Sequence, residues 1–320
     1  MSTLQALVVA GTLASLAGAG GGQASEPVSA SAGMSKPLPE VTIRAERTKL
    51  FGRVLKFVDQ IAIPENGGDG GLVRWVVPSV CPLVSGLPRN EGEFILERLS
   101  EIARAAQVPL ASEHCRPNLY ILVTPQPEDL LKGMEKRNRA FTFGFDSTPG
   151  PFVPTLTPAS VVDQFIATPR AVRVWYNTVM QTPDGDPTSQ CDIGPLLYGK
   201  NLGPIYVPCN TWSQSSHLAL NMVSTLRRVF VVVDQQRLQG VSRGQLADYV
   251  SLVGLAKLNP DAHLGDAETI LRLFDKTPRA APAGLTDWDQ AFLKSLYATE
   301  QKLRTQRGLI SHEMVREIIP

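Results

Sequence analysis

The sequence lacks several features by which classes of protein are usually recognised. Among its 320 residues only 7% are aromatic, four are cysteine and four are histidine. Lys and Arg number 31 against 30 Asp and Glu, so the net charge of +1 provides no basic surplus for a nucleic-acid partner. The hydrophobic share of 43%, with 26 glycines and 25 prolines, excludes a disordered tail, a coiled coil and a collagen-like rod.

The apolar stretch at the N-terminus is too short to span a membrane. It covers residues 4–19, whereas a membrane-spanning helix needs about 20 residues, and Glu26 is the first charged side chain. Small residues at 17–19 and 22–24 suit cleavage by a signal peptidase, although no Lys or Arg precedes the stretch. We therefore expect residues 1–24 to be a signal peptide, no transmembrane segment after its removal, and a periplasmic or secreted protein.

The four cysteines fit export. No two of them are close enough for a C-x-x-C redox or zinc pair, and four cysteines permit three connectivities between which the sequence does not choose. Local pairing is the favoured interpretation, because each pair then falls within one half of the chain. The predicted disulfides are Cys81–Cys115 and Cys191–Cys209.

A Pro-rich passage around residues 146–158 divides the chain after the signal peptide into two halves. The expected segments are a flexible leader at 25–40, an α+β half at 41–150, a second α+β half at 157–310 and a C-terminal tail at 311–320. Alternating or continuous apolar runs predict strands at 41–43, 119–123, 171–180 and 228–234. Helical periodicity and capping signals predict helices at 47–62, 90–106, from 127, 159–166, 243–252, 267–274 and 287–297. The capping signals include a capping box of Asn90 with Glu93, and Thr157 as the N-cap residue before Pro158.

Strands come first and helices last along the chain. This order favours an α+β fold with a mixed or antiparallel sheet over a doubly wound sheet.

Ser242 lies in a G-x-S-x-G motif at residues 240–244, the pattern of the nucleophile elbow in α/β-hydrolases. That elbow needs a strand running directly into the turn, but residues 235–239 separate the motif from the nearest strand. Ser242 also stands three residues before Gln245, which makes it a capping box for the following helix. His263 is available downstream as a triad base, without any distinctive context.

Two segments partly match zinc motifs. His312 and Glu313 begin like H-E-x-x-H, but Arg316 occupies the position of the second histidine. The helix around Asp248 can be aligned at Gly254 with the longer motif H-E-x-x-H-x-x-G-x-x-H, and Asp248 then takes the place of the catalytic glutamate.

None of the three histidine positions of that longer motif holds a histidine in this chain. They are occupied by Ala247, Ser251 and Lys257. Because zinc needs at least three N, O or S ligands, we predict no metal and no cofactor. A divergent metal site with ligands scattered among Asp248, His217 and His263 is the alternative.

Three strings of residues resemble a family of uncharacterised exported proteins of Gram-negative bacteria. They are Arg74-Trp75…Cys81-Pro82…Gly86-Leu87, Cys115-Arg116-Pro117-Asn118-Leu119 and Leu246-Ala247-Asp248-Tyr249…Gly254-Leu255. The resemblance extends over residues 41–297 and implies export without implying an activity.

Residues 254–297 also resemble a wider family of secreted metalloprotease-like proteins. The matching residues are Gly254-Leu255…Thr269-Ile270…Phe274…Leu285-Thr286…Asp289…Leu296-Tyr297. This resemblance implies a degenerate zincin-like fold in the C-terminal half, with its metal site lost.

Three functional hypotheses follow. The first is a non-catalytic binding or scaffold protein for a peptide, an envelope component or another protein, bound in part through an exposed strand edge. The second is a secreted hydrolase, either of the serine type through Ser242 or a divergent metallopeptidase around Asp248. The third is a structural role in the cell envelope.

Overall fold

A computed structural model describes ten segments of the chain. They are residues 39–63, 72–146, 155–181, 189–192, 206–209, 223–259, 261–265, 267–275, 281–301 and 305–319. The predicted signal peptide, and all but the last two residues of the predicted leader, lie outside them. The chain divides into the units Met1–Thr42 and Ile43–Pro320, and the central sheet belongs to the second.

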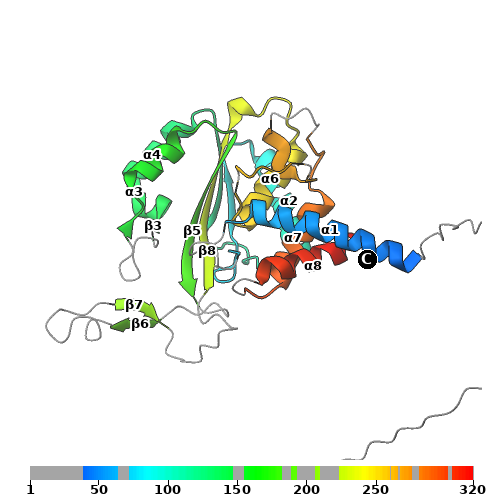
Figure 1. The fold of residues 1–320 in the computed structure, drawn as a ribbon. Helices are drawn as coiled ribbons and strands as arrows, with labels where there is room; N and C mark the ends of the chain where they lie inside the picture. Colours follow the sequence, from blue (N-terminus) through cyan, green and yellow to red (C-terminus); the bar gives the residue numbers. More distant parts are fainter. Residues whose placement is uncertain are drawn as a thin grey trace, which may run out of the picture. The chain divides into compact units, whose positions relative to one another are not determined.

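The central sheet is mixed and has four strands in the order β1-β2-β8-β5 (Figure 1). The strands are β1 (Pro82–Ser85), β2 (Leu119–Thr124), β8 (Val223–Asp234) and β5 (Val172–Gln181). The first three run parallel, and β5 runs antiparallel to β8. The predicted α+β class is thus confirmed, with a mixed sheet. Strands from both predicted halves lie side by side in it.

Helices cover both faces of the sheet (Figure 1). Side chains of β8 alternate between two cores, with Val229 and Val231 in the larger and Val232 in the smaller. The helices that line the larger core are α1 (Pro39–Ile61), α2 (Arg89–Ala105), α6 (Arg243–Leu255), α7 (Asp287–Ala298) and α8 (Gln306–Ile318). The smaller core is closed by α3 (Pro127–Phe143) and α4 (Ala159–Ala167).

The remaining described elements are short. Two small ribbons pair β3 (Phe145–Asp146) with β4 (Thr155–Leu156) and β6 (Ser189–Asp192) with β7 (Tyr206–Cys209). Two turns of 3-10 helix are η3 (Gln235–Arg237) and η4 (Ile270–Phe274). No helix in the described segments is long and apolar enough to cross a membrane.

Helix α6 is buried on all sides over most of its length, as is typical of a helix inside a hydrophobic core. Every residue from Leu246 to Leu255 is buried, between the sheet and helices α2 and α7. Gly254 allows the close approach to the sheet, since a Cβ there would lie 3.1 Å from two methyl carbons of Leu119. The glycine of the predicted zinc-motif frame therefore has a packing role in this fold.

Three aromatic side chains satisfy the last carbonyl groups of α6. The Tyr176 hydroxyl donates to the Val253 carbonyl at 2.9 Å, and the Trp75 indole N–H donates to Gly254 at 2.9 Å. The Tyr297 hydroxyl donates to Leu255 at 2.6 Å. A buried helix end needs such partners because water cannot reach its free carbonyls.

Four details of the sequence prediction are corrected by the structure. The strand expected at 41–43 is wrong, because α1 already begins at Pro39. The predicted N-cap of α2 at Asn90 is wrong, because Pro88 is the N-cap residue and the helix begins at Arg89. Glu93 forms an ion pair with Arg89 and not a capping box with Asn90. The helix expected at 267–274 is the short η4.

The fourth correction concerns the start of α4. Pro158, not Thr157, is its N-cap residue, and the Thr157 hydroxyl donates to the Phe143 carbonyl at 2.8 Å. At the other end of the chain, residues 311–318 of the predicted tail belong to α8, where Ser311, Met314 and Val315 are buried.

The predicted disulfide Cys81–Cys115 is confirmed and ties the start of β1 to the loop before β2. Cys191 and Cys209 lie on the neighbouring strands β6 and β7, opposite Val207 and Ser189 respectively. Their side chains are outside the described part of the structure, so the second disulfide stays a prediction.

Removal of the Cys81–Cys115 bridge should destabilise the fold. The bridge closes a loop with a sequence separation of 34 residues, for which the loop-entropy relation gives roughly 3 to 4 kcal/mol. We expect the variant C81S/C115S to lose about that much free energy of unfolding in urea titrations. A loss below about 1 kcal/mol would contradict this expectation.

Gly254→Ala should also destabilise the protein. The new methyl group meets the buried Leu119 side chain, and overpacking of a core costs about 1 to 3 kcal/mol, more than the helix gains from alanine. Gly133→Ala in α3 is the matched control, because a Cβ there meets nothing within 4 Å and should stabilise by about 0.5 to 1 kcal/mol. Equal effects of the two variants on the unfolding midpoint would contradict the packing role.

Candidate functional site

Asp248 is the charged residue in the buried part of helix α6, Leu246 to Leu255. Its side chain is only 4% exposed, and it forms an ion pair with Arg98 of α2. Arg98 Nε donates to Asp248 Oδ1 at 2.6 Å, and Arg98 Nη2 donates to Oδ2 at 3.3 Å. The backbone N–H of Leu285 donates to Oδ2 at 2.6 Å. Both carboxylate oxygens are therefore occupied by donors from two other segments of the chain.

Arg98 also donates to Glu101 one turn further along α2, at 3.3 Å. The hydrogen bond to Asp248 is the main cause that raises the pKa of the Arg98 guanidinium above its usual value, so the group stays charged. The arginine is 39% exposed at its side chain, and it thereby connects a buried carboxylate with the surface. Sequence analysis missed this residue, since no motif includes it.

A second buried carboxylate, Asp289, lies at the start of α7. It accepts the N–H groups of Ile270 at 2.8 Å and Thr286 at 3.0 Å, and the hydroxyl of Thr269 at 2.5 Å. Burial raises the pKa of Asp289 from 3.8 to about 6, and these hydrogen bonds partly oppose that rise. Since Leu285 donates to Asp248 and Thr286 to Asp289, the loop before α7 is held by two aspartates in succession.

Ser242 is the N-cap residue of α6. Its hydroxyl accepts the Gln245 N–H at 3.1 Å, and the Gln245 side chain accepts the Ser242 N–H at 3.0 Å. The predicted capping box is confirmed. The turn η3 and the loop after it separate Ser242 from the end of β8, so the strand does not run directly into the motif as a nucleophile elbow requires.

The structure does not gather the other predicted site residues around Asp248. His263 is exposed in the segment 261–265, beside Asp261, which pairs with Arg170 at 2.6 Å. His217 lies outside the described residues. His312 is exposed on α8 and stacks on Phe51 with 4.3 Å between ring centroids.

Two residues at the histidine positions of the aligned zinc motif, Ala247 and Ser251, do not fit a zinc ion. Ala247 has no donor atom, and the buried Ser251 hydroxyl donates to the Ala247 carbonyl at 2.6 Å. Within the described segments, no group of three or more His, Cys, Asp or Glu side chains could hold a metal ion.

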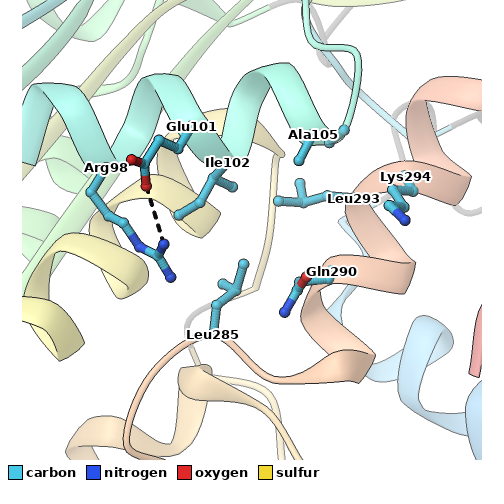
Figure 2. Close-up of a pocket in the computed structure, with 9 residues that line it drawn as sticks. Arg98, Glu101, Ile102, Ala105, Leu285, Gln290, Leu293 and Lys294 are labelled. Carbon is cyan, nitrogen blue, oxygen red and sulfur yellow. Dashed lines mark hydrogen bonds and ion pairs between the residues drawn. The ribbon is translucent and has the colours of Figure 1, made fainter.

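A pocket of about 240 Å³ lies between α2 and α7, beside Arg98 (Figure 2). The apolar part of its lining is formed by Ile102, Ala105, Ala106, Leu285 and Leu293. Its polar lining consists of Arg98, Glu101, Gln290 and Lys294. Asp248 is not among the lining residues, because Arg98 and the Leu285 backbone cover its carboxylate.

Comparison of the sequence with models of protein families, with curated proteins and with solved structures gave no match.

Arg98→Ala should destabilise the protein by about 3 kcal/mol in urea unfolding, because it leaves the buried Asp248 carboxylate without its counter-charge. The matched control is Arg89→Ala on the same helix. Its ion pair with Glu93 is exposed, with 91% and 58% of the two side chains accessible, so its loss should change the stability little. A loss of the same size in both variants would show that Asp248 does not need Arg98.

The titration of Asp289 should make stability depend on pH. Because the pKa is raised in the folded state, the folded state binds the proton more tightly, and this stabilisation is present below about pH 4 and lost as the pH rises through about 6. The unfolding free energy of the wild type minus that of Asp289→Asn should therefore fall by up to about 3 kcal/mol between pH 4 and 7. A difference that stays constant or rises with pH would contradict the raised pKa.

Proposed function

We propose that this protein is an exported, non-catalytic binding protein on a degenerate zincin-like scaffold. The observation that carries the proposal is the state of Asp248, the residue aligned with a catalytic glutamate. A general base must reach the proton that it accepts, directly or through one water molecule. Both oxygens of Asp248 are engaged by Arg98 and Leu285, and its side chain is 4% exposed.

The proposed loss of a metal site is supported by the donor set. Ala247 and Ser251 offer zinc no free ligand, so these positions give no support to a metal-dependent reaction. The serine alternative is disfavoured by geometry, because the Ser242 hydroxyl is used to cap α6.

Export is supported by the Cys81–Cys115 disulfide, since disulfides persist mainly in oxidising compartments such as the periplasm or the extracellular space. We infer that residues 1–24 are the signal for that export. The family of exported Gram-negative bacterial proteins that the sequence resembles agrees with this location. The partner proposed is a peptide, an envelope component or another protein, and the pocket between α2 and α7 is the proposed point of contact.

The test compares the purified wild type with Ser242→Ala and Asp248→Asn on chromogenic ester and peptide substrates, together with metal analysis of the wild type. We expect that neither substitution lowers the rate of substrate turnover below that of the wild type, and that the wild type holds less than one zinc ion per chain. Ser242→Ala should still lose about 1 kcal/mol of stability, because it loses the helix cap.

Two results would overturn the proposal. One is turnover that Asp248→Asn or Ser242→Ala abolishes while the protein stays folded. The other is one tightly held zinc ion per chain.

A further inference from the structure

We infer that the pocket between α2 and α7 binds one leucine-sized aliphatic side chain of a peptide, together with the adjoining backbone amide. The inference rests on the proposed binding function and names its ligand class. It follows from three properties of the pocket, which are its size, its walls and the pairing of its charges.

The size selects a single side chain. Pockets for whole small-molecule ligands usually measure about 300 to 1,000 Å³, whereas this pocket measures about 240 Å³. Its walls are Ile102, Leu285 and Leu293 with two alanines, which suit an aliphatic group rather than a polar one. A larger partner can therefore insert only one residue and must leave the rest of its chain outside.

The charges at the rim favour a neutral ligand over an ionic one. Arg98 is paired with Asp248 and Glu101, and Lys294 is paired with Glu317 at 2.9 Å. Each of these two cations already has a carboxylate partner, so a charged ligand finds no unpaired counter-charge at the rim. A neutral ligand can keep every pair intact.

The polar groups that remain suit an amide. A guanidinium has five N–H groups, and the bonds to Asp248 and Glu101 use three of those on Arg98. Gln290 lies across the pocket from Arg98 (Figure 2), and its side-chain amide makes no hydrogen bond to another described residue. It offers both a donor and an acceptor. A peptide carbonyl can accept from Arg98 or Gln290, and a peptide N–H can donate to Gln290.

The probe for the test is N-acetyl-leucinamide, added to the full mature chain and followed through the backbone NMR signals of Leu285, Gln290 and Leu293. We expect saturable shifts with a dissociation constant in the low-millimolar range, about what a ligand of this size can reach. N-acetyl-lysinamide carries a charge on its side chain, and 4-methylpentanoate carries a carboxylate in place of the amide. Both should bind at least about tenfold more weakly than N-acetyl-leucinamide.

Two variants test the position of the site. Ala105→Phe places a ring at the pocket from an exposed position at the end of α2, and it should abolish the shifts. Ala167→Phe, at the exposed end of α4, is the matched control and should leave them unchanged. Gln290→Leu, which removes the amide with little change of volume, should weaken binding about fivefold, the equivalent of one hydrogen bond of about 1 kcal/mol.

Three results would overturn the inference. They are no saturable shift with N-acetyl-leucinamide, binding of 4-methylpentanoate with the same affinity as N-acetyl-leucinamide, and wild-type affinity of Ala105→Phe for N-acetyl-leucinamide. Its failure is distinguishable from failure of the proposed function. Saturable amide binding by a protein that also turns over substrate would reject the non-catalytic role and keep the peptide site. Absence of both binding and turnover would reject the peptide site and keep the non-catalytic role.

Discussion

The ion pair between Asp248 and Arg98 is the constraint on which the rest of this structure depends. Helix α6 is buried on every side, and a lone carboxylate in such a place would be strongly unfavourable. Arg98 and the Leu285 N–H supply the missing charge and hydrogen bonds. The pair joins positions 150 residues apart and so fixes α2, α6 and the loop before α7 together.

The same arrangement explains why the pocket forms where it does. Leu285 is held by its N–H on Asp248, and the next residue, Thr286, is held by Asp289 at the start of α7. The loop is thereby fixed with the Leu285 side chain in the pocket wall, opposite α2. A position that a protease would use for catalysis stabilises a binding surface in this chain, according to our proposal.

Local features of the fold could be predicted from the sequence, but contacts between distant segments could not. The run at 228–234 and the cap at Ser242 are local signals, and the structure confirms both. Arg98 carries no local signal, because an arginine on the polar side of an amphipathic helix is ordinary until its partner is known. The strand prediction at 41–43 was wrong because three β-branched residues do not outweigh the longer helical pattern that follows them.

The central claim is that Asp248 has a structural role through Arg98, and a double-mutant cycle tests it most directly. The unfolding free energies of the wild type, Arg98→Ala, Asp248→Ala and the double variant give the coupling energy of the pair. We predict a coupling of about 2 kcal/mol or more at neutral pH, as expected for a partly buried, hydrogen-bonded ion pair. A coupling near zero would contradict the claim and reopen the assignment of Asp248.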